Sequence, residues 1–266
     1  MSKIIAIANQ KGGVGKTTTC INLAASLAAT HRSVLLIDLD PQGNATMGSG
    51  IDKNATEHST CDLLLGDVSL ADLVIKGKSV EDVEYDVLPG NGDLTAAEVA
   101  LMEMPNRERQ LRNALENVRD EYDYILIDCP PSLNMLTLNA LVAANSVMIP
   151  MQCEYYALEG LSALMETVES IRSTVNPDLH IEGLLRTMYD PRNNLANDVS
   201  GQLLLHFPKK VYRTVIPRNV RLAEAPSHGI PVISYDKSSR GALAYLALAG
   251  EILRNDENAT LVGASA

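Results

Sequence analysis

The chain has 266 residues, of which 46% are hydrophobic and 21% are charged, and its formal net charge at pH 7 is −11. This composition is typical of a globular chain with one large domain or two small ones, and it excludes a chain too polar to collapse. No run approaches the roughly 18 consecutive apolar residues that a transmembrane helix requires, so we expect no membrane span.

The amino-terminal segment and the cysteines both favour a cytoplasmic protein. The first ten residues, MSKIIAIANQ, carry one lysine and lack the apolar core and cleavage site of a signal peptide. The four cysteines are far apart and form no C-x-x-C pair, so neither a metal knuckle nor a disulfide framework is expected. They are Cys20, Cys61, Cys129 and Cys153.

Apolar β-rich runs alternate with helical patterns along the chain, which predicts a parallel sheet with crossover helices. The predicted strands are residues 3–8, 33–38, 85–89, 123–128, 146–150, 180–187 and 211–216. Most of these strands are continuous apolar runs, as expected where helices cover both faces of a sheet. The predicted helices are residues 16–29, 107–120, 134–144, 157–174, 196–206 and 239–254.

Two segments fit this alternation less well. Residues 44–80 are irregular and are expected to hold short helices or a mobile insertion. The last twelve residues, 255–266, are polar or small and are predicted to be a flexible tail. We therefore predict a single α/β domain over residues 1–254, with a mainly parallel twisted sheet and helices on both faces.

A glycine-rich run, QKGGVGKTT from Gln10 to Thr18, lies between the first predicted strand and the first predicted helix. Such a loop surrounds an anion with backbone N–H groups, and glycine lets the backbone approach phosphate oxygens. Lys16 can reach the β- and γ-phosphates, and the Thr17 hydroxyl can ligate Mg²⁺. The alternative, a glycine turn that merely precedes a helix, does not account for a GKTT run at this position.

Aspartates follow two predicted strands at the edge where this loop lies. Asp38 and Asp40 end the second strand, and Asp128 ends the fourth. Because ligands of open α/β sheets gather at the carboxyl ends of the strands, these side chains are expected to converge on the loop. Asp128 then fits a carboxylate that holds Mg²⁺ through water. The alternative for each aspartate alone is a cap on the following turn.

The loop also departs from the ordinary phosphate-binding pattern GxxxxGK[ST], because Gln10 replaces its first glycine and Lys11 adds a second lysine. The run KGGVGKTT resembles the deviant Walker A motif of the ParA/Soj/MinD family of partition ATPases. Five further blocks resemble chromosomal-type ParA/Soj proteins, and together they reach nearly the whole chain. They are DLDPQGNATMGSG, YDYILIDCPPSLNMLTLNAL, PMQCEYYALEGL, TMYDPR and VIPRNVRLAEAPSHG.

The resemblance implies a single P-loop NTPase domain that uses ATP and Mg²⁺, and it gives each matched residue a role. Lys11 would reach across a homodimer interface to the partner's nucleotide, and Asp40 would position the attacking water, with Asp38 as a polar support. Thr17 and Asp128 would hold the metal. Pro217 and Asn219 would flank the adenine. The remaining nucleotide-binding positions would be Gly12, Gly13, Val14, Gly15, Lys16 and Thr18.

A local excess of positive charge contrasts with the acidic whole. Residues 186–240 contain nine Lys and Arg against four Asp and Glu. By resemblance, Arg192 and Arg221 are linked to DNA binding, and the other candidates in this segment are Arg218, Arg213, Lys237 and Arg240. Contacts of this kind with phosphate are independent of sequence and depend strongly on salt. The alternatives are solvated surface charges and, for Arg218, a place beside the nucleotide.

Other branches of the superfamily can be separated on residues. A MinD-like membrane helix would need cations near the end of the chain, where Asp256 and Glu257 stand and no Lys or Arg follows Arg254. A cluster-binding branch would need paired cysteines, which Cys129 lacks. Strand one begins by residue 4, so no DNA-binding extension of the plasmid type is expected. A small-molecule kinase or ligase on the same loop stays as the rival, although no substrate constellation is evident.

These inferences combine into one hypothesis about function. Mg-ATP would drive dimerisation, the dimer would bind double-stranded DNA without sequence preference, and hydrolysis would release it. No arginine finger is evident in the chain, so slow intrinsic turnover and stimulation by a ParB/Spo0J-like centromere-binding partner are expected. The expected location is the cytoplasm, in association with the nucleoid.

Overall fold

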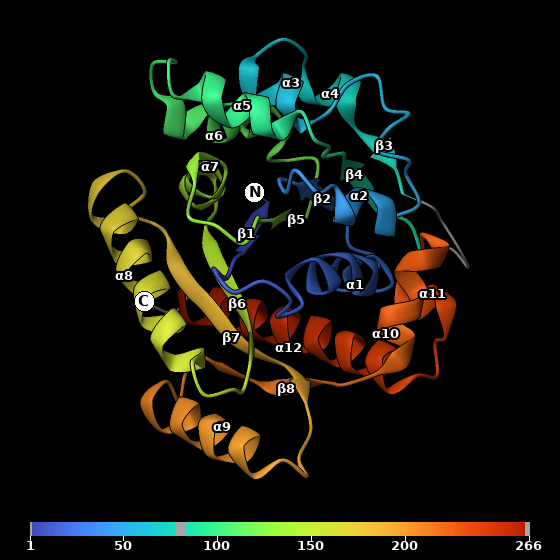
Figure 1. The fold of residues 1–266 in the computed structure, drawn as a ribbon, viewed down its shortest axis with the longest axis vertical. Coiled ribbons are helices and arrows are strands. Elements are labelled where there is room, and N and C mark those ends of the chain that lie inside the picture. The colour runs from blue at the N-terminus through green and yellow to red at the C-terminus, as the bar shows by residue number, and fades with distance from the viewer. Residues whose placement is uncertain (1, 78–82, 264–266) are drawn as a thin grey trace.

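A computed structural model describes residues 2–77 and 83–263. In this part of the chain one sheet of eight strands has the order β3-β4-β2-β5-β1-β6-β7-β8 (Figure 1). All neighbouring strands are parallel except β3 and β4. The strands are β1 Lys3–Ile7, β2 Val34–Asp38, β3 Ile75–Lys76, β4 Asp86–Leu88, β5 Tyr124–Asp128, β6 Ser146–Gln152, β7 His180–Tyr189 and β8 Val211–Pro217.

Helices cover both faces of the sheet, as the crossover connections of a parallel sheet require. The α-helices are α1 Lys16–Ala28, α2 Asn44–Gly48, α3 Thr60–Leu65, α4 Leu70–Leu73, α5 Leu94–Leu101, α6 Gln110–Leu115, α7 Met135–Ala143, α8 Ala157–Thr174, α9 Asn194–His206, α10 Val220–Glu224, α11 Val232–Tyr235 and α12 Arg240–Gly263. Short 3₁₀ turns are η1 Arg107–Arg109, η2 Glu116–Val118 and η3 Ala225–His228.

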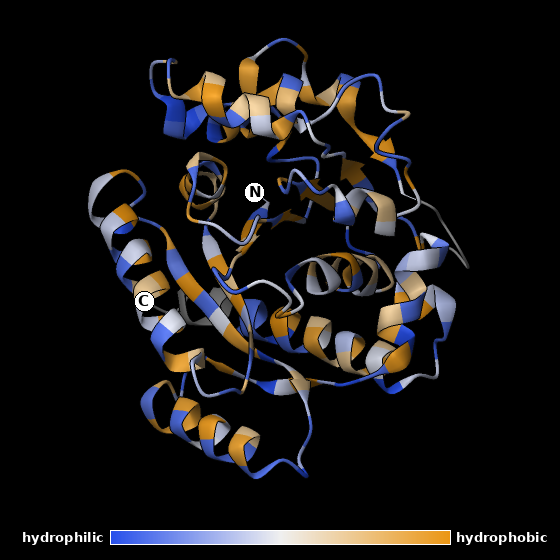
Figure 2. Cartoon of the chain, viewed as in Figure 1, coloured by the Kyte–Doolittle hydropathy of each residue, from blue (hydrophilic) through white to orange (hydrophobic). Residues whose placement is uncertain are grey.

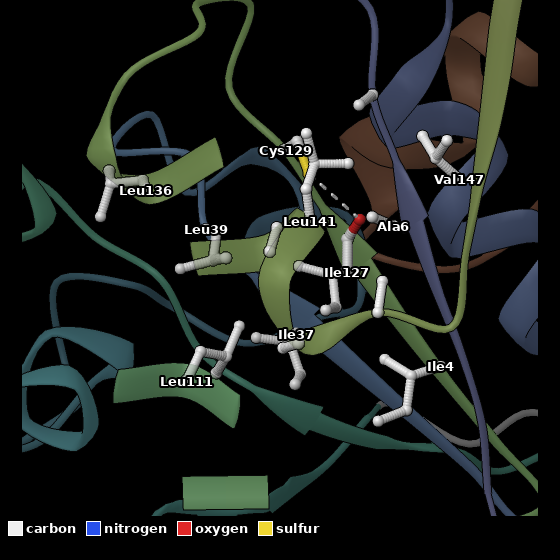
Figure 3. Close-up of a cluster of buried hydrophobic side chains, with 14 of the residues drawn as sticks. Ile4, Ala6, Ile37, Leu39, Leu111, Ile127, Cys129, Leu136, Leu141 and Val147 are labelled. Carbon is white, nitrogen blue, oxygen red and sulfur yellow. Dashed lines mark hydrogen bonds between the residues drawn. The ribbon is translucent and has the colours of Figure 1, made fainter. Parts of the chain in front are cut away.

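The central strand β1 separates two hydrophobic cores. Ile4 and Ala6 face a core that includes residues of α3 and of α5 to α9, whereas Ile5 and Ile7 face a core built with α1 and α10 to α12. Figure 3 shows part of the first core, where side chains from β1, β2, β5, α6 and α7 gather. Burial on both faces explains why the strands are continuous apolar runs.

The outer helices bury only one side. In α8 the buried residues are Leu161, Leu164, Val168 and Ile171, which follow helical spacing. Figure 2 shows the resulting mixture of hydrophobic and hydrophilic residues around α8 and α9. This pattern is the helical signal that predicted α8 with its exact bounds.

All seven predicted strands are confirmed, each to within two residues at either end. The eighth strand, β3, was not predicted, because two antiparallel residues at a sheet edge carry no periodicity. The predicted helix 107–120 is wrong in part, since it divides into η1, α6 and η2. The segment 44–80 contains the short helices α2, α3 and α4, and its last residues, 78–80, lie outside the described residues.

The carboxyl-terminal helix differs from the expected boundary at residue 254. Helix α12 continues to Gly263. Asp256 accepts hydrogen bonds from Lys3 at 2.5 Å and from the Tyr124 hydroxyl at 2.6 Å. These contacts dock the first turn beyond residue 254 against β1 and β5, which composition alone did not indicate.

Gly183 in β7 provides a test of this packing. A Cβ at Gly183 would lie 2.4 Å from the ring of Tyr212 on β8. We expect Gly183→Ala to lower the free energy of unfolding by about 1–3 kcal/mol, because the buried ring has to move. In the control Gly201→Ala, on exposed α9, a Cβ meets nothing within 4 Å, and we expect a gain of about 0.5–1 kcal/mol. Urea unfolding measures both, and equal stabilities would contradict the packing.

Candidate functional site

The loop between β1 and α1 has a backbone that requires glycine at two positions. Gly13 and Gly15 have φ angles of 73° and 88°, where other residues are strained. Helix α1 then begins at Lys16, with no side-chain cap and no acidic residue in its first turn. Its first N–H groups are therefore available to an anion, and the positive end of the helix favours a phosphate.

Two neighbouring strands hold this loop in place. Asn9 donates its side-chain amide to the Pro150 carbonyl of β6 at 2.8 Å and accepts from the Lys11 backbone N–H at 2.9 Å. The Thr187 hydroxyl of β7 donates to the Val14 carbonyl at 2.7 Å in a buried contact. Sequence reasoning missed Thr187, although it begins the TMYDPR block. Its signal was a hydroxyl residue near the carboxyl end of a strand beside the loop.

Lys16 is the cation inside the loop. Its residue is only 7% exposed, and its ammonium donates to the Lys11 carbonyl at 3.3 Å. Burial lowers the pKa of Lys16 from its ordinary value, and the charges of Asp128 and Asp40 partly offset this effect. A phosphate beside this ammonium would compensate the cost of burying it.

Asp128 is the carboxylate that the structure leaves unpaired. Both of its oxygens are buried, and neither makes a hydrogen bond of ordinary geometry within the described chain. Burial raises the pKa of Asp128 well above its ordinary value, the charge of Asp38 on the neighbouring strand raises it further, and the Thr17 hydroxyl lowers it. A buried carboxylate without partners is costly, and a bound cation would satisfy it.

These residues fit Mg²⁺. No group of three or more His, Cys, Asp and Glu is arranged to hold a metal within residues 2–77 and 83–263. Mg²⁺ usually keeps several waters and takes one or two protein ligands together with substrate phosphates. Thr17 and Asp128, the two residues for which the sequence predicts this role, could provide such a sparse set beside the phosphate loop.

Asp38 and Asp40 have different surroundings. Asp38 accepts from the Thr46 backbone N–H at 2.8 Å, from the Thr46 hydroxyl at 2.7 Å and from the Asp40 N–H at 3.1 Å. Burial raises the pKa of Asp38 to about 6 despite these hydrogen bonds, which lower it. Asp38 thus supports the turn after β2. Asp40 accepts from the Gln42 N–H at 2.9 Å and is almost fully buried next to the loop.

A cavity of about 200 Å³ adjoins the loop at the carboxyl ends of β7 and β8. Gly15 and Thr18 line it on one side, and Pro217, Arg218 and Asn219 line it on the other. The Asn219 side chain also caps α10 by accepting from the Leu222 N–H at 3.3 Å. The two residues predicted to flank adenine are therefore brought to the phosphate loop by the fold.

Lys11 lies outside this arrangement. Its ammonium pairs with Glu154, which follows β6, and both side chains are about half exposed. The next two residues, Tyr155 and Tyr156, are highly exposed and form an edge-to-face ring pair with centroids 5.0 Å apart. Both tyrosines therefore lie on the surface and not in the core.

The six predicted DNA-binding residues are all exposed, and the ion pairs of Arg192 and Arg221 lie within the chain. Arg192 binds both oxygens of Asp190, and its hydrogen bonds lower the pKa of Asp190 to about 2. Arg221 lies 2.7 Å from Glu224 and 3.3 Å from Asp236. Surface pairs of this kind contribute little free energy, so another anion can replace the carboxylate.

The fold separates the basic residues into groups. Arg218 and Arg221 adjoin the start of α12, because Gly241 packs against Leu222 and Asn219. Arg213 lies earlier on the edge strand β8, in a groove with Arg254. Arg186 contributes nothing to the surface, since it is buried and donates to the Ser200 hydroxyl and the Tyr212 carbonyl.

Comparisons with known proteins agree with this site. A family model described as an AAA domain matches residues 2–181. The chain is 56% identical to the sporulation initiation inhibitor protein Soj of Bacillus subtilis, over 96% of this chain and all of that protein. It is 51% identical to the chromosome partitioning protein ParA of Myxococcus xanthus, over 96% and 89% of the two chains.

The chain belongs to the ParA/Soj family of chromosome-partitioning ATPases. The expected family and fold class are thereby confirmed. A solved structure of cobyrinic acid a,c-diamide synthase from Mycobacterium smegmatis, with bound ADP and magnesium, is also similar. It has a TM-score of 0.84 and 36% identity, and the match covers 97% of this chain and 96% of that one. Among the helices that the structure describes, none is long and apolar enough to cross a bilayer.

Thr187 offers a test of how β7 supports the phosphate loop. We expect Thr187→Val to weaken ATP binding by roughly fivefold, because a hydrogen bond worth about 1 kcal/mol is lost at Val14. Thr187→Ser keeps the hydroxyl and is expected to bind ATP like the unaltered protein. Titration calorimetry measures both affinities. Unchanged binding by Thr187→Val would show that the loop keeps its shape without this contact.

Proposed function

We propose that this protein is an ATP-operated DNA-binding switch of chromosome partitioning. Mg-ATP binds the phosphate loop, two chains then close into a dimer, and the dimer binds double-stranded DNA without sequence preference. Hydrolysis, stimulated by a ParB/Spo0J-like centromere-binding partner, reverses these steps. The observation that carries the proposal is the separation of the two loop lysines, with Lys16 buried inside the loop and Lys11 on the surface outside it.

The nucleotide site uses residues that are already in position. The N–H groups of the loop and the Lys16 ammonium bind the phosphates, and the cavity beside Pro217 and Asn219 accepts the base. Thr17 and Asp128 would hold Mg²⁺, which would neutralise the charge that develops on the phosphates. The related structure with ADP and magnesium supports this assignment.

Lys11 is available to a second chain. It points away from its own loop toward Glu154, and the exposed Tyr155 and Tyr156 lie beside that pair. An ion pair between half-exposed side chains contributes about 0–1 kcal/mol, so a triphosphate on a facing chain can compete with Glu154 for this ammonium. Closure of two chains would therefore exchange an internal carboxylate for a phosphate at each Lys11.

DNA binding depends on a dimer that brings together the small basic surfaces of two chains. The whole chain is acidic, so one copy is repelled by DNA except at the region around Arg218, Arg221, Lys237 and Arg240. A dimer that aligns two such regions roughly doubles the phosphate contacts and steepens the dependence on salt. The local carboxylates at Arg192 and Arg221 reduce this attraction, which keeps DNA affinity low in the single chain.

Hydrolysis requires the water to be oriented. The Asp40 carboxylate already accepts a hydrogen bond from the Gln42 N–H. It accepts a second hydrogen bond from the attacking water and so orients it. An arginine supplied by a partner can stabilise the transition state, so we expect slow turnover by the protein alone and faster turnover with the partner. Release from DNA returns the protein to the cytoplasm around the nucleoid.

The rival function is a small-molecule ligase, the activity for which the Mycobacterium smegmatis relative is named. The higher identity to Soj and ParA over nearly the whole chain favours partitioning. A ligase would convert a small molecule in the presence of ATP. A partition protein would instead turn over ATP faster when DNA and its partner protein are both present.

A sizing experiment with ATP, ADP or no nucleotide, with and without plasmid DNA, tests the proposal. We expect a dimer and DNA retention with ATP alone. Lys16→Ala should show neither, because its phosphate contact is lost, whereas Asp40→Ala should bind ATP, hydrolyse it at least tenfold more slowly and stay on DNA. DNA retention by the ADP form equal to that of the ATP form would refute the switch.

Arg221 tests the position of the DNA surface. Arg221→Glu replaces attraction by repulsion and is expected to weaken DNA retention at moderate salt by tenfold or more, while ATP-dependent dimerisation continues. Arg172→Glu on α8 is the matched control, since Arg172 also forms a surface ion pair at i,i+3 spacing. Filter binding at two salt concentrations gives the comparison. Equal losses in both variants would indicate that net charge, and not this surface, controls binding.

A further inference from the structure

A groove of about 570 Å³ lies between β8 and α12. Strand β8 is the last strand of the sheet, and α12 packs along it (Figure 1). Arg213 and Thr214 line the groove from the strand. One face of α12 lines it at helical spacing, through Ala247, Gly250, Glu251 and Arg254. None of these residues lines the nucleotide cavity, so the groove is a separate feature of the surface.

The only carboxylate that lines the groove is already occupied by the backbone. Glu251 accepts from the Arg213 N–H at 2.8 Å and from the Thr214 N–H at 2.9 Å, and these bonds fix β8 to α12. Within the part of the chain that the structure describes, no carboxylate forms an ion pair with Arg213 or Arg254. Both guanidinium groups are therefore available to an external anion.

The two arginines are held before any ligand binds. The Arg213 backbone is fixed on both sides, since its N–H donates to Glu251 and its carbonyl accepts from the Arg186 guanidinium at 3.2 Å. A Cβ at Gly250 would lie 3.2 Å from Nη1 of Arg254. The Arg254 guanidinium thus lies close to the helix backbone, where glycine leaves room for it. Groups that are already placed lose less entropy when a ligand binds.

The charge in and behind the groove favours an anion. Two arginines and one glutamate give the lining a net charge of +1. Arg186 adds a buried cation on the other face of β8, where it donates to the Ser200 hydroxyl and the Tyr212 carbonyl. Both of these partners are uncharged, so the charge of Arg186 is not neutralised by them. A concave surface with this excess attracts anionic ligands.

The size and the remaining lining of the groove indicate a ligand larger than an inorganic ion. Small-molecule sites typically have volumes of about 300–1,000 Å³, and this groove lies within that range. Leu246 and Ala247 provide an apolar surface beside the arginines, and Asn255 and Asn258 provide amide groups at the other end. Guanidinium groups match phosphate in both charge and geometry, because they can donate two parallel hydrogen bonds.

We propose that the groove between β8 and α12 binds a small organic phosphate. The phosphate lies between the guanidinium groups of Arg213 and Arg254, and the planar or apolar part of the ligand lies against Leu246 and Ala247.

This groove is distinct from the proposed DNA surface. The sequence groups Arg213 with the DNA-binding candidates, whereas the structure places it in a groove with Arg254. Arg240, at the start of α12, belongs to the region around Arg218 and Arg221. At 1.5 Å per residue, Arg254 lies about 21 Å farther along the helix than Arg240.

Phenyl phosphate is the probe, since it combines one phosphate with one planar apolar ring. Saturation-transfer NMR detects its binding to the full chain without nucleotide, and competition gives the relative affinities of inorganic phosphate and phenol. We expect phenyl phosphate to bind at least threefold more tightly than inorganic phosphate, because its ring also contacts Leu246 and Ala247. Phenol should not compete at the same concentrations. Lys16→Ala should bind phenyl phosphate like the unaltered protein, since the groove lies outside the phosphate loop.

Two kinds of variant locate the binding. Arg213→Gln and Arg254→Gln should each weaken phenyl phosphate binding at least fivefold, because a charge-assisted hydrogen bond is lost. Arg240→Gln on the same helix is the matched control and should change it by less than twofold. Ala247→Trp should weaken binding at least fivefold by filling the groove. Leu243→Trp, at an exposed position of α12 outside the groove, should not.

Retention on plasmid DNA with ATP separates the groove from the DNA surface. Arg213→Gln should keep DNA retention within twofold of the unaltered protein while its phenyl phosphate binding falls. Lost DNA retention with unchanged phenyl phosphate binding would assign Arg213 to the DNA surface and overturn the organic phosphate site.

Two further results would overturn this site. Equal losses in Arg213→Gln and Arg240→Gln would show that net charge alone controls phenyl phosphate binding, and loss of binding in Lys16→Ala would show that the probe occupies the nucleotide site. Thermal unfolding checks that each variant is folded. Failure of ATP to produce a dimer, with phenyl phosphate binding intact, would count against the proposed function alone.

Discussion

The shape of one loop backbone is the constraint on which the site depends. Gly13 and Gly15 adopt positive φ angles, and only then do the first N–H groups of α1 and the Lys16 ammonium face the same space. The Val14 carbonyl between these glycines accepts a hydrogen bond from the Thr187 hydroxyl of β7. The two glycines thus set the backbone geometry between β1 and α1, next to Lys16 and the contact with β7.

The parallel order of the central strands provides the second part of the site. Because β5 lies between β1 and β2, Asp128 comes level with Asp38 and next to the phosphate loop. Burial raises the pKa of Asp128, the charges of Asp38 and Asp40 raise it further, and its two buried oxygens have no hydrogen bond of ordinary geometry within the described chain. A bound cation and a phosphate would together compensate these buried charges.

The surface divides into regions of different character around this site. The half-exposed Lys11 and the two tyrosines lie near the phosphate loop, the basic residues of the proposed DNA surface lie around α10 and the start of α12, and the groove with Arg213 and Arg254 lies between β8 and the later part of α12. On the proposed function, a second chain and DNA would contact one molecule at different places. Separate surfaces of this kind allow each contact to change with the nucleotide without direct competition.

Local patterns in the sequence were sufficient to predict every described strand except β3, and to locate the phosphate loop and the aspartates that follow β2 and β5. Continuous apolar runs predict strands that are covered on both faces. The run KGGVGKTT predicts a phosphate loop from contiguous residues alone. The signal failed for β3, α5 and the end of α12, where short length, irregular spacing or a polar composition obscured the element. From the sequence, Asp256 belongs to a polar tail. In the structure it accepts hydrogen bonds from Lys3 on β1 and Tyr124 on β5.

Tertiary structure alone decided the relations between distant residues. The contact of Thr187 with Val14, the pairing of Lys11 with Glu154, the burial of Arg186 and the groove between β8 and α12 all join segments far apart in the chain. The physical reason is that motif spacing encodes local backbone geometry, whereas burial and charge pairing depend on which elements the sheet order brings together.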